Sequence, residues 1–97
     1  MTGKIEKLEV RHNLSASRFE VQTENHIAVL NYRQRGDMII FTHTGVPAEL
    51  EGRGIGSQLV CAGLEYAREK SFEVVTLCWF VTGYIERHPE YKGLLKA

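Results

Sequence analysis

The hydrophobic pattern of this chain changes its period once, and that change limits the folds open to it. Residues 38–44 form an almost continuous apolar and β-branched run, which predicts a central strand buried on both faces of a sheet. Apolar residues then recur at helical spacing over residues 55–67, and EVVTLC at 73–78 predicts another strand. Strand, helix and strand in succession form a βαβ unit, in which strands 38–44 and 73–78 run parallel.

Shorter segments on either side of this unit complete the expected fold. Three strands are expected before it, marked by alternating apolar residues or by β-branched and aromatic residues: 8–10, 18–22 and 26–33. The turn QRGD joins the last of these to strand 38–44, so the four strands form an antiparallel meander. Two helical segments are expected after it, separated by Pro89: 80–87 and 90–96. The fold class is therefore α/β (α+β), a single domain over residues 1–97 with a mixed sheet.

Composition and charge exclude several classes of function. The 97 residues fit one domain, and 12 basic residues balance 12 acidic ones, so the charge does not favour non-specific binding to nucleic acid. No apolar run approaches the roughly 18 residues of a membrane span, and the charged N-terminal sequence is unlike a signal peptide. The two cysteines form neither a disulfide framework nor a zinc-binding spacing. We expect a cytoplasmic protein with free thiols and no metal.

Three glycines, Gly52, Gly54 and Gly56, stand between the buried strand and the long helix. Glycine costs roughly 1 kcal/mol relative to alanine inside a helix, so these positions require a specific reason. A helix N-terminus presents unpaired N–H groups and a positive dipole end, and bare backbone lets an anion approach them. A phosphate site is one interpretation. A tight turn that needs positive φ is the other.

The spacing of these glycines excludes two common phosphate sites. A P-loop needs a lysine after its last glycine, and none follows Gly56. A dinucleotide-binding turn needs a third glycine where this chain has Ser57 or Leu59. The chain is also too short for a doubly wound sheet.

The stretch Glu51-Gly52-Arg53-Gly54-Ile55-Gly56 resembles the acyl-CoA-binding motif of the GNAT acetyltransferase superfamily, [QR]-x-x-G-x-[GA]. In that family the backbone amides of this turn hold the CoA pyrophosphate, and the pantetheine arm lies between two splayed strands. The resemblance implies that strands 38–46 and 73–78 are this pair. It implies acetyl-CoA (coenzyme A) as cosubstrate and the following binding residues: Val46, Gly52, Arg53, Gly54, Ile55, Gly56 and Ser57.

The C-terminal segment narrows the resemblance to a compact GNAT-like family of about a hundred residues. Those proteins carry a cysteine at the end of the fifth strand, here Cys78, and a Y-x-x-x-H-P-E-Y tail, here residues 84–91. Two departures from the larger superfamily stand out. Glu51 replaces its Gln or Arg, and the always-charged Arg53 can offset that carboxylate. Only residues 11–18 stand where full-size enzymes have two helices that shape the acceptor pocket.

Three residues are candidates for the chemistry of acyl transfer. The resemblance implies a tyrosine acid in the helix after the fifth strand, which is Tyr84; packing over the sheet is the alternative. His43, near the end of the central strand, is a candidate base because histidine titrates near neutral pH, although it can equally be a hydrogen-bonded strand residue. Cys78 can either attack the acetyl group or line the pantetheine slot. The start of the next helix favours its thiolate, and the apolar neighbours Trp79 and Phe80 oppose it.

The function implied by these residues is that of an acetyl-CoA-dependent N-acetyltransferase. The acceptor is a small amine or a peptide or protein amine. A non-catalytic acyl-CoA-binding module is the alternative, and an interaction domain that kept only the fold is a third possibility.

Overall fold

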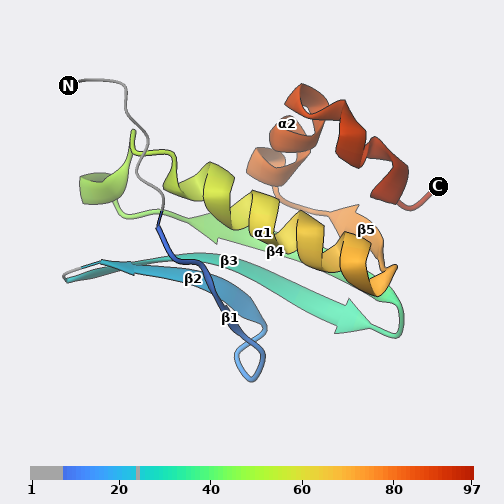
Figure 1. Cartoon of the computed structure of the whole chain (residues 1–97), viewed down its shortest axis with the longest axis horizontal. Helices are drawn as coiled ribbons and strands as arrows, with labels where there is room; N and C mark the ends of the chain where they lie inside the picture. The colour runs from blue at the N-terminus through green and yellow to red at the C-terminus, as the bar shows by residue number, and fades with distance from the viewer. Residues whose placement is uncertain (1–7, 24) are drawn as a thin grey trace.

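The structure, a computed structural model that describes residues 8–23 and 25–97, contains one mixed five-stranded sheet in the order β1-β2-β3-β4-β5 (Figure 1). The strands are β1 (Arg11–Asn13), β2 (Arg18–Thr23), β3 (His26–Arg35), β4 (Met38–Gly45) and β5 (Glu73–Thr76). Neighbours from β1 to β4 are antiparallel, and β4 and β5 are parallel. The meander and the βαβ unit expected from the sequence are therefore confirmed.

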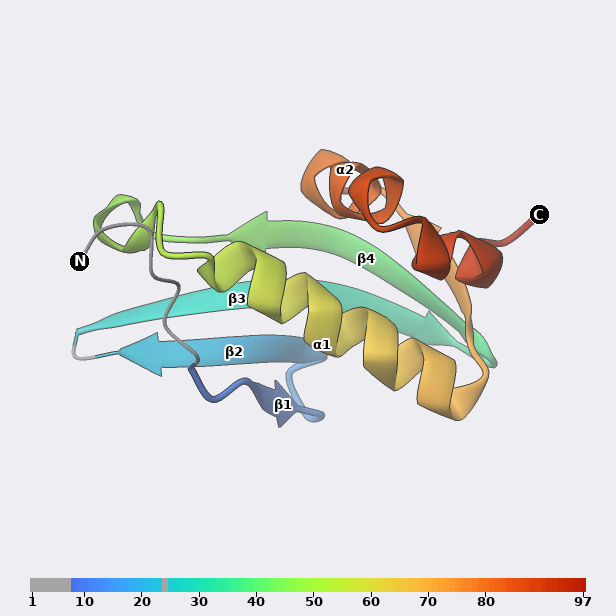
Figure 2. The same cartoon turned by 45° about the horizontal axis from the view of Figure 1, so that its top comes forward.

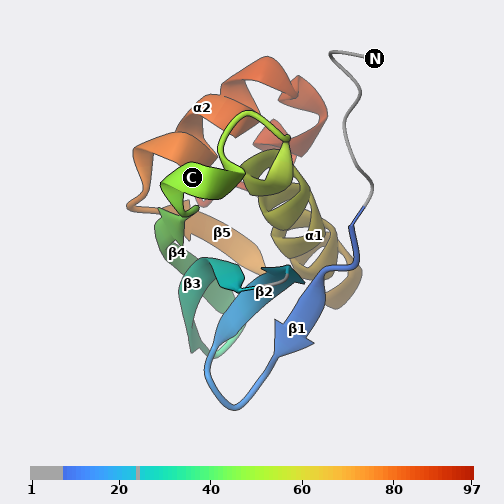
Figure 3. The same ribbon diagram turned by 90° about the vertical axis from the view of Figure 1, so that its left-hand side faces the viewer.

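The helical segments follow β4 and β5 and lie on one face of the sheet (Figures 2 and 3). They are η1 (Ala48–Leu50), α1 (Ile55–Lys70), α2 (Trp79–Arg87) and η2 (Pro89–Leu94). The long helix α1 crosses β2 and β3, and α2 lies beside it over β4 and β5. Within the described residues, the opposite face of the sheet carries no helix.

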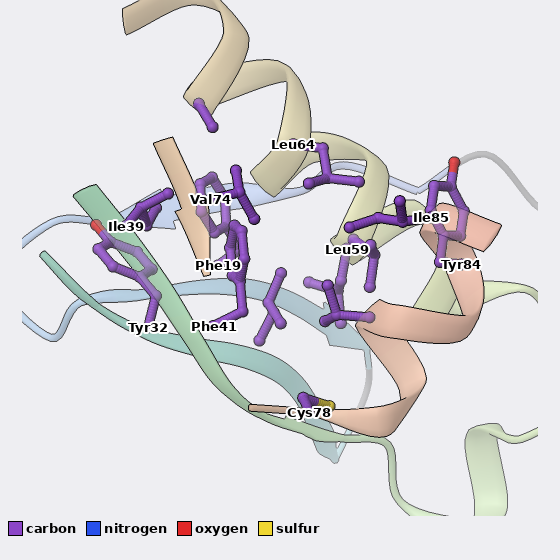
Figure 4. Packing of buried hydrophobic residues seen from close by; sticks show 14 of the residues in the cluster. Phe19, Tyr32, Ile39, Phe41, Leu59, Leu64, Val74, Cys78, Tyr84 and Ile85 are labelled. Carbon is purple, nitrogen blue, oxygen red and sulfur yellow. The ribbon is translucent and has the colours of Figure 1, made fainter. Parts of the chain in front are cut away.

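The hydrophobic core lies between the sheet and α1, because strand residues alternate between the two faces. Ile39 and Phe41 point toward the helices and are fully buried in one cluster with Leu59 and Leu64 (Figure 4). Leu30 is fully buried in the same cluster, against Gly63 of α1. Cys78 lies at one edge of this cluster, at the end where α2 begins. The core therefore fixes the position of the turn that carries Cys78.

The expectation that strand 38–44 is buried on both faces is wrong. Ile39 and Phe41 are fully buried, whereas Met38, Ile40 and Thr42 are only half-buried. Ile40 and Met38 alternate with these buried residues, so they face away from α1 and α2, on the side where the described chain has no helix. The apolar run reflects an interior strand with one covered face and one partly open apolar face.

Two strand boundaries differ from expectation. The first strand is β1 at Arg11–Asn13 rather than residues 8–10. Leu8 instead donates its backbone N–H to the side-chain oxygen of Gln58 on α1, so its alternation with Val10 reflects packing beside the helix. The last strand ends at Thr76, and Cys78 is the N-cap of α2. The helix after it begins at Trp79, one residue earlier than expected.

A glycine pair in the helices gives a matched test of this packing. A Cβ on Gly63 of α1 would lie 2.9 Å from side-chain atoms of both Leu30 and Phe41, whereas a Cβ on Gly83 of α2 would meet only the flexible end of Arg87 at 3.3 Å. Gly63→Ala is expected to lower the free energy of unfolding by about 1–3 kcal/mol through overpacking. Gly83→Ala is expected to raise it by about 0.5–1 kcal/mol through helix propensity. Urea denaturation measures both, and equal effects would contradict this packing.

Candidate active site

A cavity of about 560 Å³ opens where β4 and β5 part. The two strands pair from Met38 opposite Glu73 to Phe41 opposite Thr76, and Leu77 then donates its N–H to the carbonyl of Phe41 at 2.9 Å. Beyond that point β4 continues to Gly45 while the chain turns into α2. The volume lies in the range typical of small-molecule sites. The lining residues come from β4, the glycine turn and the start of α2: Thr42, His43, Thr44, Val46, Leu50, Glu51, Gly52, Gly54, Ile55, Gly56, Ser57, Leu77, Cys78, Trp79 and Phe80.

The structure gives each of the three glycines a reason that involves no ligand. Gly52 and Gly54 have φ of 82° and 76°, in the left-handed region that favours glycine. Gly56 has a different role, because a Cβ there would lie 2.9 Å from the ring of Phe80. The turn geometry therefore requires glycine with or without an anion. The feature that indicates an anion site is therefore the N-terminus of α1, and not the glycines themselves.

The N-terminus of α1 is open to an anion. Its N-cap residue is Gly54, so no side chain caps the helix, and its first turn contains no acidic residue. The first helical hydrogen bond is donated by Gln58 to Gly54, which leaves the amides of residues 55–57 without a helical partner. Gly56 and Ser57 line the cavity, and Glu51 borders it. Arg53, half-buried in the same turn, is not among the lining residues.

Cys78 is held at the inner end of the cavity. Its amide donates to the hydroxyl of Thr76 at 3.1 Å, and that hydroxyl donates back to the Cys78 carbonyl at 2.9 Å. Its Sγ lies 3.4 Å from the hydroxyl of Thr44. Burial opposes ionisation of the thiol. Hydrogen bonds from the Thr44 hydroxyl and from amides at the start of α2 together outweigh that effect, so the pKa of Cys78 lies below its ordinary value.

His43 lines the same cavity from the other face of the sheet. The register of β3 and β4 shifts between Tyr32 opposite Phe41 and Asn31 opposite His43, which leaves an extra residue, Thr42, on β4. His43 therefore shares a face with Asn31, away from the helices, whereas Thr44 faces them with Cys78. The bulge thus brings the thiol and the imidazole to one cavity from opposite sides.

The structure does not bring Tyr84 to this cavity. Its ring stacks on His88 with centroids 4.0 Å apart, and Figure 4 shows its hydroxyl pointing away from Cys78. Burial and a hydrogen bond with Cys61 raise the pKa of Tyr84 to about 12. The hydroxyl therefore stays protonated, but it lies among Cys61 and the tail rather than among the lining residues. The acid role that the resemblance implies for Tyr84 stays a prediction, and the position of the hydroxyl argues against it.

Several lining residues were not singled out from the sequence. Thr44, Leu77 and the aromatic residues Trp79 and Phe80 all line the cavity. Two stretches of the sequence could have indicated them: TxT at 42–44, before the glycine turn, and TLC at 76–78, where β5 ends. The strand ends around a βαβ crossover lie at one edge of the sheet, so these residues are expected to lie close together. Within the described residues there is no group of three side chains suited to a metal ion, and no helix long and apolar enough to cross a membrane.

Comparison with known proteins identifies the family. Residues 18–94 match the family described as GCN5-related N-acetyl-transferase, and that match covers most of the chain. The chain belongs to this family, whose members generally use acetyl-CoA. The resemblance noted in the glycine turn and the C-terminal tail is thereby confirmed.

Individual relatives agree with this assignment. The chain is 31% identical to Protein NATD1 of Gallus gallus over 85 residues, which cover 84% of this chain and 77% of the chicken protein. Protein NATD1 of Mus musculus gives the same identity and coverage. A GCN5-like protein from Staphylococcus aureus, described as a candidate N-acetyltransferase and solved by NMR, superimposes with a TM-score of 0.73 at 29% identity. That match covers 93% of this chain and 89% of the S. aureus chain, and it confirms the expected fold class.

Proposed function

We propose that the protein is an acetyl-CoA-dependent N-acetyltransferase whose reaction takes place in the cavity between β4 and β5. One observation carries the proposal: the glycine turn, the Cys78 thiol and the His43 imidazole line a single cavity. An anion site suits the pyrophosphate of CoA, and a nucleophile and a base are groups that promote acyl transfer to an amine. Family membership supports the same reaction class.

The residues present fit acetyl-CoA. The uncapped N-terminus of α1 suits a pyrophosphate, with Gly52, Gly54, Gly56 and Ser57 at the cavity wall and Arg53 in the same turn. Val46 and Ile55 add apolar wall for the pantetheine arm. When bound, acetyl-CoA supplies an acetyl group activated as a thioester. The cavity lies between the anion site and Cys78, so both ends of the ligand have matching groups.

The chain's own groups then have distinct roles. Cys78, with its lowered pKa, is the nucleophile that accepts the acetyl group, and Thr44 donates a hydrogen bond to its thiolate. His43 takes a proton from the acceptor amine, because it lines the cavity from the face that no described helix covers. CoA would leave as its thiolate when its bond to the acetyl group breaks, and it would take up the proton lost by the Cys78 thiol. Attack of the amine on the acetylated Cys78 would then form the amide, break the carbon–sulfur bond and release the Cys78 thiolate, while His43 holds the proton from the amine.

A non-catalytic acyl-CoA-binding module is the second candidate. The sheet face beside His43 favours it, because no described helix covers that face, where full-size enzymes have helices that shape the acceptor pocket. The experiment is to measure CoA release from acetyl-CoA with a panel of amines, alongside thermal shift with CoA. The proposal predicts amine-dependent release. Binding without release supports the module, and no binding supports an interaction domain that kept only the fold.

His43→Gln is expected to lower turnover by roughly 10²–10⁴-fold, the usual contribution of a general base. Acetyl-CoA affinity should change little, because the proton is transferred only during reaction. Tyr84→Phe is the matched comparison. Since Tyr84 does not line the cavity, we expect turnover to stay within a few-fold of that of the unmodified protein. Steady-state kinetics measures turnover, and calorimetry measures acetyl-CoA affinity. A large loss of turnover in Tyr84→Phe, with none in His43→Gln, would mean that Tyr84 takes part in the reaction and His43 does not.

A further inference from the structure

A second cavity, of about 570 Å³, lies on the helix-free face of the sheet. Its lining combines apolar and cationic side chains: Arg33, Arg35, Met38, Ile40, Thr42 and Leu77. Arg33 lies directly opposite Ile40 in the register of β3 and β4, and Arg35 lies opposite Met38. The floor is therefore an apolar strip along β4 with two arginines along one side. We call this surface the β4 groove.

The β4 groove leads into the proposed active site. Thr42 and Leu77 line both cavities, and His43 follows at the next position of β4. Two large apolar side chains continue the strip past the mouth: Leu77 is 72% exposed and Trp79 is 84% exposed. An exposed tryptophan near arginines is typical of an interaction surface, and Leu77 adds apolar area beside it. A bound chain in the groove would thus end beside the base.

The charge of the groove selects among acceptors. Arg33 and Arg35 are exposed, and within the described residues neither has an ion pair. Of the described strand residues, two carboxylates share this face of the sheet. Glu73 lies across Met38 from Arg35, beyond the apolar strip. Glu20 lies on β2, where it is paired with Arg18. Guanidinium groups bind carboxylates with directed hydrogen bonds, whereas a polyamine or a lysine-rich segment would be repelled.

We propose, resting on the proposed function, that the acceptor is an acidic protein segment that lies extended in the β4 groove with its amine beside His43. Successive residues on one face of a strand are about 6.6 Å apart, so Arg33 and Arg35 lie about two and four residues along the groove from Thr42. The acidic side chains should therefore follow the amine-bearing residue by about two and four positions. Leu77, Met38 and Ile40 contact the apolar side chains between them.

The probe is a fluorescein-labelled eight-residue peptide with a free N-terminal amine, leucine at positions two and four, and aspartate at positions three and five. Fluorescence anisotropy is expected to show it binding about tenfold more tightly than the same peptide with glutamine at those positions, as two partly exposed ion pairs allow. Raising the salt concentration should remove the difference. Amide NMR shifts should localise to residues 38–42 and to Leu77.

Charge reversal provides the matched control. R33E/R35E is expected to invert the preference, so that a lysine-substituted peptide binds and the aspartate peptide does not. R87E/K92E makes the same change in net charge on exposed residues of α2 and η2, and the aspartate preference should persist. Equal binding of all peptides, or a single-stranded oligonucleotide binding more tightly than the aspartate peptide, would overturn the inference. Peptide binding without acetylation would refute only the proposed function, and acetylation of small amines without groove binding would refute only this inference.

Discussion

Replacing Cys78 with alanine is expected to lower amine acetylation by roughly a hundredfold or more, the lower end of what one catalytic group contributes. Before any acceptor is added, intact-protein mass spectrometry after incubation with acetyl-CoA should show one acetyl group on the unmodified protein and none on Cys78→Ala. The reason is that Cys78 lines the cavity and its lowered pKa favours the thiolate, the form that attacks a thioester. The affinity of Cys78→Ala for CoA should remain within a few-fold of that of the unmodified protein.

Cys61 provides the control, because it is the other cysteine in the sequence and lies on α1 with its Sγ 3.7 Å from the hydroxyl of Tyr91. Cys61→Ala should keep the adduct. Thr44→Val should raise the pKa of Cys78, because it removes a donor to the charged thiolate. The pH at which alkylation of Cys78 reaches half its maximal rate should therefore move upward. If no adduct forms and Cys78→Ala acetylates amines at the unmodified rate, transfer is direct and Cys78 only lines the cavity.

Gly52→Ala is expected to weaken CoA binding by about 10–100-fold, or about 1.4–2.8 kcal/mol. The substitution places a methyl group on the cavity wall at the anion site while the fold persists, since a Cβ at Gly52 meets no atom within 4 Å. Calorimetric titration with CoA measures the loss.

The control is Gly36→Ala, in the turn between β3 and β4. Gly36 also has positive φ, at 58°, and a Cβ there also meets nothing within 4 Å. Both variants therefore bear a similar backbone strain of about 1–2 kcal/mol, but only Gly52 lines the cavity. Gly36→Ala should bind CoA like the unmodified protein. Equal affinities in the two variants would place the pyrophosphate elsewhere.

The order of strands and helices could be predicted well from the sequence, because that order depends on local patterns. The alternation in β2 and β3, the helical spacing of α1 and Pro89 after α2 each depend on near neighbours in the chain. Burial on only one face of β4 was missed, because an apolar run does not say whether a helix covers it. That property depends on where α1 and α2 pack.

The candidate site likewise combines features that local sequence patterns predict with features that depend on distant parts of the chain. The glycine turn was visible because glycine spacing is local. The pairing of Cys78 with Thr44, 34 residues apart, depends on the parallel register of β4 and β5. The face taken by His43 depends on the extra residue in β4, which no periodicity reveals. The distance of Tyr84 from the cavity follows from how α2 packs on Cys61, which is also non-local.

An amide NMR titration of the protein with CoA would show whether acetyl-CoA binds in the cavity between β4 and β5. We expect saturable shifts that are largest at residues 42–46, 52–57 and 77–80, the segments that line the cavity. The same titration of Gly52→Ala should need a much higher CoA concentration, and that of Gly36→Ala should not. Absence of saturable shifts, or shifts confined to β1 and β2, would contradict the account.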